Sequence, residues 1–310
     1  MPKRMHVSPF GGGSESQAQG AGSAAYTRTD LACESDAPAA EEIRETVEVE
    51  AGSAPVTVTR RRETDGGRSV TLSCGSFTAR GEGDIPGLAA LLAQELRRMA
   101  AVMLGRDVDT SCRVLAVGLG NAHMTPDAIG PETVRRLTVT RHLKEYDPAL
   151  FEALGCCELS ALSPGVLGQT GVESGELVKC AVGLIRPDLV VAVDALAARS
   201  VERLSATVQI SDGGIAPGAG IGNRRMALCR ETLGCPVMSL GVPTVVDSST
   251  LVWDALEQAG MTESGVPEHL SAVLERGRSF IVSPKDCDEV VELAARLLAR
   301  ALDEAFGIGQ

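Results

Sequence analysis

Two kinds of hydrophobic pattern run along the chain. Residues 46–50, 56–59 and 70–73 alternate apolar and polar positions with a period of two, which predicts half-buried strands. Residues 86–104 and 286–306 place apolar side chains at helical spacing, which predicts two amphipathic helices. We therefore expect an N-terminal β layer, a helix that follows it, and a long helix near the C-terminus.

The middle of the chain alternates uncharged runs with helical patterns. Residues 114–117, 189–193 and 236–240 carry no charge, as strands buried on both faces do. Residues 175–185 are predicted to be helical, and residues 146–172 are Gly- and Pro-rich, which is typical of irregular structure. This alternation predicts an α/β fold with a mostly parallel sheet and helices on both faces.

Composition narrows the class of protein. The 310 residues are 44% hydrophobic but only 3% aromatic, so the core is expected to consist of Ala, Val and Leu. The net charge of −12 argues against nucleic acid or an anionic membrane as a partner. No signal-peptide pattern precedes residue 28, so we expect a cytoplasmic protein. Residues 1–28 are rich in Gly, Ser, Ala and Gln and predict a disordered tail.

Two aspartates are the leading candidates for chemistry. Asp127 and Asp194 both come after uncharged strands. The carboxyl ends of parallel strands meet at one edge of a sheet, so the two carboxylates lie close together if the strands are neighbours. Such a pair shares a proton and supplies a general acid and a general base, which can activate water against an amide. Alternatively, each aspartate caps the helix that follows it.

A glycine-rich turn separates the first uncharged strand from Asp127. Gly118, Gly120 and Asn121 lack the third glycine of a dinucleotide-binding loop, so no nucleotide cofactor is expected. The backbone N–H groups of Gly120 and Asn121 could instead form an oxyanion site.

Metal binding is the competing chemistry. His123, Asp127, Asp194 and Asp247 could gather as nitrogen and oxygen ligands, although no two of them have zinc-motif spacing. The nine cysteines include no CxxC pair. We therefore expect no bound metal.

Three arginines follow predicted strands or the glycine-rich loop at 211–225. Arg199, Arg224 and Arg225 could receive the acidic side chains of a substrate. The alternative is a solvated surface on which they pair with nearby glutamates.

Several long phrases together resemble the germination protease, or spore protease, family, whose members cleave small acid-soluble spore proteins when bacterial spores germinate. The resemblance covers nearly everything after residue 27. The phrases are RTDLACE at 28–34, VGLGNAHMTPDAIGP at 117–131, SPGVLGQTGVES at 163–174, VVAVDALAARSVERL at 190–204, QISDGGIAPGAGIGNRR at 209–225 and GVPTVVDSSTL at 241–251.

The resemblance implies a catalytic pair formed by Asp127 and Asp194. It also implies a zymogen that processes itself at an acid followed by an apolar residue, Ala, any residue and Glu. Asp30-Leu31-Ala32-Cys33-Glu34 fits this pattern, so cleavage is expected between Asp30 and Leu31. The chain then divides into a disordered propeptide, residues 1–30, and a single peptidase domain, residues 31–310.

The resemblance further implies an α/β/α sandwich similar to hydrogenase-maturation peptidases, a homotetramer, and action inside the forespore or spore core. Small acid-soluble spore proteins are the implied substrate. Two other functions stay open on the same fold. One is a metal-dependent peptidase of the hydrogenase-maturation type, and the other is a non-enzymatic nickel carrier or scaffold.

Overall fold

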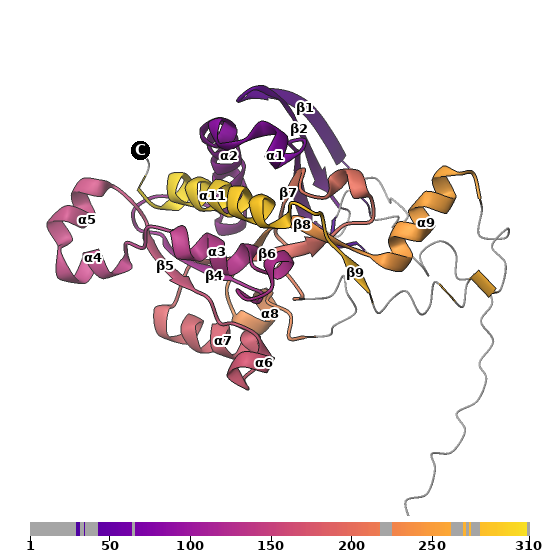
Figure 1. The fold of residues 1–310 in the computed structure, drawn as a ribbon. Coiled ribbons are helices and arrows are strands. Elements are labelled where there is room, and N and C mark those ends of the chain that lie inside the picture. The colour runs from indigo at the N-terminus through magenta and orange to yellow at the C-terminus, as the bar shows by residue number, and fades with distance from the viewer. Residues whose placement is uncertain are drawn as a thin grey trace, which may run out of the picture.

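The computed structural model describes residues 29–31, 34, 43–63, 66–217, 225–261, 269–270, 273 and 280–308. Nine strands form one sheet (Figure 1). The strands are β1 Ile43–Ala51, β2 Ala54–Arg62, β3 Arg68–Ser73, β4 Arg113–Gly118, β5 Glu158–Leu162, β6 Leu189–Ala197, β7 Thr207–Ser211, β8 Val237–Asp247 and β9 Ile281–Val282.

Helices and short helical turns connect these strands. The α-helices are α1 Phe77–Arg80, α2 Ile85–Leu104, α3 Ile129–Arg136, α4 Arg141–Tyr146, α5 Pro148–Leu154, α6 Leu167–Thr170, α7 Ser174–Ile185, α8 Arg230–Leu233, α9 Ser248–Gln258 and α11 Cys287–Phe306. The 3-10 turns are η3 Glu82–Asp84, η4 Thr125–Asp127 and η5 Val201–Arg203. The structure confirms both predicted amphipathic helices as α2 and α11. None of the helices in the described ranges is long and apolar enough to cross a membrane.

The strand order is β1-β2-β3-β7-β8-β6-β4-β5, with β9 paired to β8. Only β5, β4, β6 and β8 are mutually parallel, so the predicted mostly parallel sheet is correct for this central part alone. The N-terminal strands are confirmed, but they extend the same sheet through an antiparallel β3–β7 pair and form no separate layer. The link from β6 to β7 is too short for a parallel crossover, so β7 runs antiparallel to β8.

Helices cover both faces of the parallel strands, because successive side chains of a buried strand point to opposite sides. Val114 and Ala116 of β4 join the core that α2 and α11 cover. Leu115 and Val117 join a second core against α7 (Figure 1). The expected helix–sheet–helix layering is present around β4 and β6.

Two predicted boundaries are wrong. Residues 146–172 are not irregular throughout, since they contain α5, β5 and α6. The sequence pattern did not predict strand β5, because Glu158 and Ser160 interrupt its apolar run, although both are buried. Strand β6 does not end at Asp194 but continues to Ala197, because its small residues pair with β8. Asp194 therefore lies within a strand.

Candidate active site

The two candidate aspartates lie beside each other because β4 and β6 are neighbours. Gly118 of β4 is in register with Val193, the residue before Asp194. The loop after β4 is held against β6, since the Leu119 N–H donates to the Val193 carbonyl over 2.8 Å. A side chain on Gly130 of α3 would collide with the backbone of both Leu119 and Val193. Close backbone contact therefore fixes the loop that carries Asp127.

The loop is shaped around the Asp127 carboxylate. The Asn121 N–H donates to Asp127 Oδ2 over 2.8 Å. Gly120 has φ 108°, and a Cβ there would lie 2.0 Å from the Asp127 carbonyl oxygen, so only glycine fits. Asp127 does not cap α3, whose N-cap is Ala128. The alternative role as a helix cap is therefore wrong for Asp127, and the loop turns its carboxylate toward Asn121.

Asp194 has a more buried environment. Its side chain is 6% exposed, and Oδ1 accepts from the Ala195 N–H over 2.9 Å. Burial raises the pKa of Asp194 well above its ordinary value, and the neighbouring charges of Asp127 and then Asp30 raise it further. Asp194 lies inside β6, so it caps no helix there.

Asp127 is less strongly perturbed. Burial raises its pKa, but the Asn121 N–H and the positive charge of Arg225 oppose the rise. The pKa of Asp194 is therefore raised more than the pKa of Asp127, and an acid–base pair requires such a difference. Asp194 favours the protonated form, and Asp127 is the group that ionises first.

Part of the N-terminal region lies in this site. We call residues 29–31 and 34 the docked segment. The Asp30 N–H donates to the Ala197 carbonyl, and the Ala197 N–H donates to Asp30 Oδ2, each over 2.9 Å. A cavity beside the segment is lined by Asp30, Asp127, Asp194 and Arg225, and a second is lined by Asp30, Leu31 and Asp194. Asp30, the residue before the predicted cleavage bond, thus lines a cavity together with both aspartates.

The Asp30 carbonyl has a side-chain donor. Gln209 of β7 is 6% exposed and donates from Nε2 to the Asp30 carbonyl oxygen over 2.9 Å. This carbonyl belongs to the predicted cleavage bond. The Asn121 N–H, which we expected at an oxyanion site, is instead bonded to Asp127, and Gly120 supplies the turn. Gln209 is a hydrogen-bond donor to this carbonyl.

The residues after Asp30 are also bound. Leu31 is 1% exposed and packs with Leu196, Ala198, Leu204 and Ile215. The Glu34 N–H donates to the Leu31 carbonyl over 3.0 Å. The Glu34 side chain lies against the residues that follow β6.

The Glu34 carboxylate is held by donors from one short stretch. Oε2 accepts from the Arg199 N–H over 2.7 Å, and Oε1 accepts from the Ser200 N–H over 3.0 Å. Arg203 Nε lies 3.3 Å from Oε1. The Thr29 hydroxyl also donates to Oε2, over 2.5 Å. The Glu34 side chain is only 5% exposed, so this contact is an enclosed carboxylate site.

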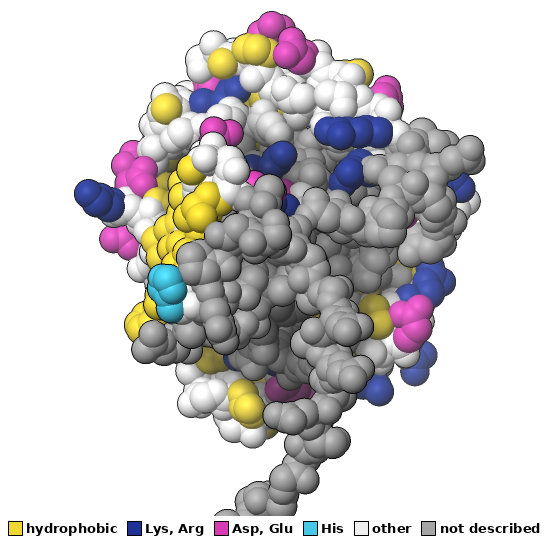
Figure 2. Space-filling view, turned by 90° about the vertical axis from the view of Figure 1, so that its right-hand side faces the viewer, with side chains coloured by type: hydrophobic (Ala, Val, Ile, Leu, Met, Phe, Trp, Pro, Cys, Tyr) yellow, Lys and Arg dark blue, Asp and Glu magenta, His cyan; other side chains and the backbone are white. Residues whose placement is uncertain are grey.

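The predicted arginines have separate positions. Arg225 lines the cavity with Asp127 and Asp194. Arg199 contacts Glu34 through its backbone, while its guanidinium pairs with Glu257 of α9 over 2.5 Å. Arg224 lies outside the described residues. Figure 2 shows Lys and Arg side chains in the upper and right-hand parts of the face in view, although the whole chain has a net charge of −12.

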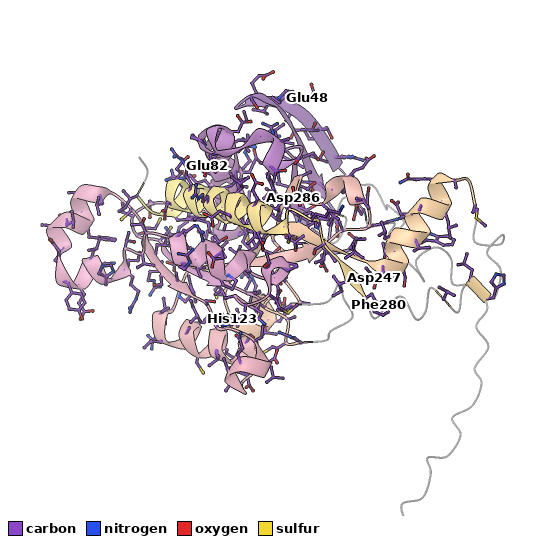
Figure 3. The ribbon with its side chains drawn as sticks, viewed as in Figure 1. Glu48, Glu82, His123, Asp247, Phe280 and Asp286 are labelled. Carbon is purple, nitrogen blue, oxygen red and sulfur yellow. The ribbon has the colours of Figure 1, made fainter. Side chains whose placement is uncertain are left out.

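Of the four residues considered as metal ligands, His123 and Asp247 do not join Asp127 and Asp194. His123 is exposed, and the buried Asp247 caps α9 by accepting from the N–H groups of Ser249 and Thr250. Figure 3 shows Asp247 next to Phe280 and well apart from His123. Among the residues that the structure describes, no three His, Cys, Asp or Glu side chains are placed to hold a metal ion.

Comparison with known proteins identifies the family. The family model described as germination protease, peptidase family A25, matches residues 35–259. The chain belongs to the germination protease family. A germination protease of Clostridium perfringens is 37% identical over 260 residues, covering 77% of this chain and 78% of its own. One from Clostridium acetobutylicum is 38% identical over the same shares. One from Bacillus pumilus is 49% identical over 158 residues, covering 51% of this chain and 42% of its own.

Membership in this peptidase family agrees with the resemblance seen in the sequence. The sequence did not point to Gln209 or to the pocket around Leu31. Gln209 sits in a short strand whose other residues are apolar or small, and nothing in its spacing marks it. The order RTDLACE was the available signal for the binding of this segment, because an acid precedes the apolar Leu31 there and Glu34 follows.

Proposed function

We propose that the chain is an endopeptidase that first cleaves its own Asp30–Leu31 bond and then cleaves small acid-soluble spore proteins. The observation that carries this proposal is the position of the Asp30 carbonyl. Gln209 donates to it, and Asp30 lines both cavities that Asp194 lines. A peptide bond is thus held beside two carboxyl groups of different pKa.

In the proposed mechanism, Asp127 is the general base. Its carboxylate takes a proton from a water molecule as the water oxygen attacks the Asp30 carbonyl carbon. Negative charge then develops on the carbonyl oxygen, where the Gln209 N–H groups stabilise it. A donor fixed in a buried site does this without reorganising when the charge appears.

Asp194 is the general acid. Burial favours its protonated form, so it holds a proton to give to the Leu31 nitrogen. The carbon–nitrogen bond then breaks, leaving a carboxyl group on Asp30 and an amine on Leu31. Asp127 has gained one proton and Asp194 has lost one, so transfer of a proton between the two restores the starting state.

The enclosed contacts support this bond as the one cleaved. Leu31 fills an apolar pocket on one side, and the Asp30 carboxylate is bound by a backbone N–H on the other. The Asp30 N–H and the Ala197 carbonyl extend β6 by a strand-like contact, a common way to bind a peptide backbone. We propose residues 1–30 as the propeptide and 31–310 as the peptidase domain. Residues 1–28 lie outside the described residues.

The first test is the intact mass of the purified full-length chain after incubation at mildly acidic pH. The expected product has lost residues 1–30 and begins at Leu31. The Asp127→Asn and Asp194→Asn chains should keep their full mass. Equal loss in the wild type and both variants would show a contaminating protease and overturn the proposal.

We also propose that the enzyme is a homotetramer that acts in the spore core. The family resemblance supports both, and β1 lies at the end of the strand order, where its outer edge can meet another copy. Light scattering of the full-length chain should give four chain masses. A value of one chain mass would contradict the assembly without affecting the mechanism.

A further inference from the structure

The site around Glu34 has the chemistry of a carboxylate receptor. Two successive backbone N–H groups, those of Arg199 and Ser200, each meet a different carboxylate oxygen. Arg203 adds a guanidinium from η5. Charge-assisted hydrogen bonds of this kind are stronger than neutral ones and favour an ionised acceptor. An amide at this place would turn an N–H group toward at least one of these donors.

The site also sets a distance along the peptide. Leu31 is buried in its apolar pocket, and the Glu34 N–H donates to the Leu31 carbonyl. The two pockets are therefore filled by the first and the fourth residue after Asp30. A substrate that fills both pockets in the same way carries its acid at the fourth residue after the cut.

A consequence follows for the processed enzyme. Cleavage after Asp30 leaves Leu31 and Glu34 attached to the peptidase domain. The contacts with Leu196, Ser200 and Arg203 remain after the cut. The contacts of Leu31 and Glu34 with the Thr29 hydroxyl are lost, because Thr29 leaves with the propeptide. A substrate of the same pattern needs the same two pockets. A tethered segment competes at high effective concentration, which depends on the length of its link.

We infer that Arg203 and the Arg199 and Ser200 amides form a carboxylate subsite for the fourth residue after the cut. We further infer that Glu34 occupies this subsite in competition with substrate. The inference rests on the proposed function, because it takes Asp30–Leu31 as the cleaved bond. Glu34 thus has two opposite effects: it positions the chain's own bond for processing, and it obstructs cleavage of other chains.

The test uses the full-length chain with Glu34→Gln, Arg203→Gln or, as a matched control, Arg135→Gln. Arg135 is exposed and pairs with Glu132, away from the docked segment. Self-processing is followed by intact mass. Cleavage in trans is followed on processed enzyme with a peptide of residues 27–36 that carries serine at the Cys33 position, and with a second peptide in which the Glu34 position is Gln.

Glu34→Gln should slow self-processing about tenfold and lower the KM for the acidic peptide several-fold, because a charge-assisted contact is lost from the competitor alone. Arg203→Gln should slow self-processing and raise that KM. Arg135→Gln should change neither. The Gln peptide should have a higher KM than the acidic peptide in the wild type, and this difference should shrink in Arg203→Gln.

Two results would overturn the inference. One is a Glu34→Gln chain that processes itself at the wild-type rate. The other is a wild-type enzyme that cleaves both peptides with equal kcat/KM. If Glu34→Gln lowers activity in cis and in trans alike, Glu34 supports the fold and is not a competitor.

Binding separates this inference from the proposed function. In an Asp127→Asn background, fluorescence anisotropy of the labelled acidic peptide needs no catalysis. The Glu34→Gln addition should tighten binding about tenfold, and the Gln peptide should bind more weakly than the acidic one. If the wild type cleaves nothing but these differences are found, the subsite stands and the proposed function fails. If the wild type cleaves but these binding differences are absent, the proposed function stands and the subsite fails.

Discussion

The loop that carries Asp127 and the strand that carries Asp194 place the same side chain in two different environments. Asp127 follows a glycine turn, and its carboxylate accepts from a backbone N–H and lies near Arg225. Asp194 is inside β6, almost fully buried, and next to two other acids. In the proposed mechanism, position in the fold, and not residue type, decides which aspartate accepts a proton and which one holds a proton.

Removing one carboxylate at a time tests the proposed roles of Asp127 and Asp194 most directly. Asp127→Asn and Asp194→Asn should each lower self-processing at least about a thousandfold, because a general base or acid that contributes this much has no replacement in either amide. Intact mass over time measures the loss. A circular dichroism spectrum like that of the wild type shows that the fold is kept, and a variant with near-normal processing contradicts the assigned pair.

The next largest effect concerns Gln209, which donates to the Asp30 carbonyl. Gln209→Leu should lower the rate of the cleavage step about a hundredfold, since it removes the N–H donor on the Asp30 carbonyl and keeps a similar shape. Gln258→Leu, on the exposed part of α9, is the matched control. Single-turnover processing separates this step from binding. An unchanged rate in Gln209→Leu would remove Gln209 from the mechanism.

The proximity of the two aspartates could be predicted from the sequence, because each follows an uncharged run that lies in a parallel strand. Their different environments could not. Asp194 was expected at the end of its strand, and its burial depends on the continuation of β6 to Ala197 against β8. Pairing of this kind joins residues far apart in the chain, and hydrophobic period alone does not reveal it.

Gln209 was missed for a related reason. Gln209 lies on β7, which runs antiparallel to β8, and the prediction of a mostly parallel sheet did not include this pairing. The N-terminal strands were found from their alternation, but their place at the end of the same sheet depends on the β3–β7 pair. Local pattern therefore gave the elements, while the contacts between distant strands determined which polar side chains meet.

Changing the pH sharpens the difference between the two aspartates. The proposed mechanism requires Asp127 without its proton and Asp194 with one, so the rate of processing should rise and then fall with pH. Arg225 lowers the pKa of both groups. Arg225→Gln should therefore move both limbs of the profile to higher pH, whereas Arg135→Gln should leave them in place. A profile that Arg225→Gln does not shift would contradict the charge assignment.

The smallest expected effect is on the free energy of unfolding, and it differs between the Asp127 and Asp194 variants. Because folding raises the pKa of Asp194 above its ordinary value of 3.8, the native state binds the proton more tightly than the unfolded state. Ionisation of Asp194 consequently destabilises the fold as pH rises from that value to the folded pKa. Asp194→Asn removes this term and keeps an oxygen for the Ala195 N–H.

At pH 7, urea unfolding of Asp194→Asn should therefore give a higher free energy of unfolding than that of the wild type, because the variant carries no carboxylate that burial disfavours. The difference should vanish below about pH 4, where the acid is protonated in both states. Asp127→Asn should gain less, because the Asn121 N–H and Arg225 already stabilise its carboxylate. Equal gains in the two variants would mean that the loop and the strand impose the same environment after all.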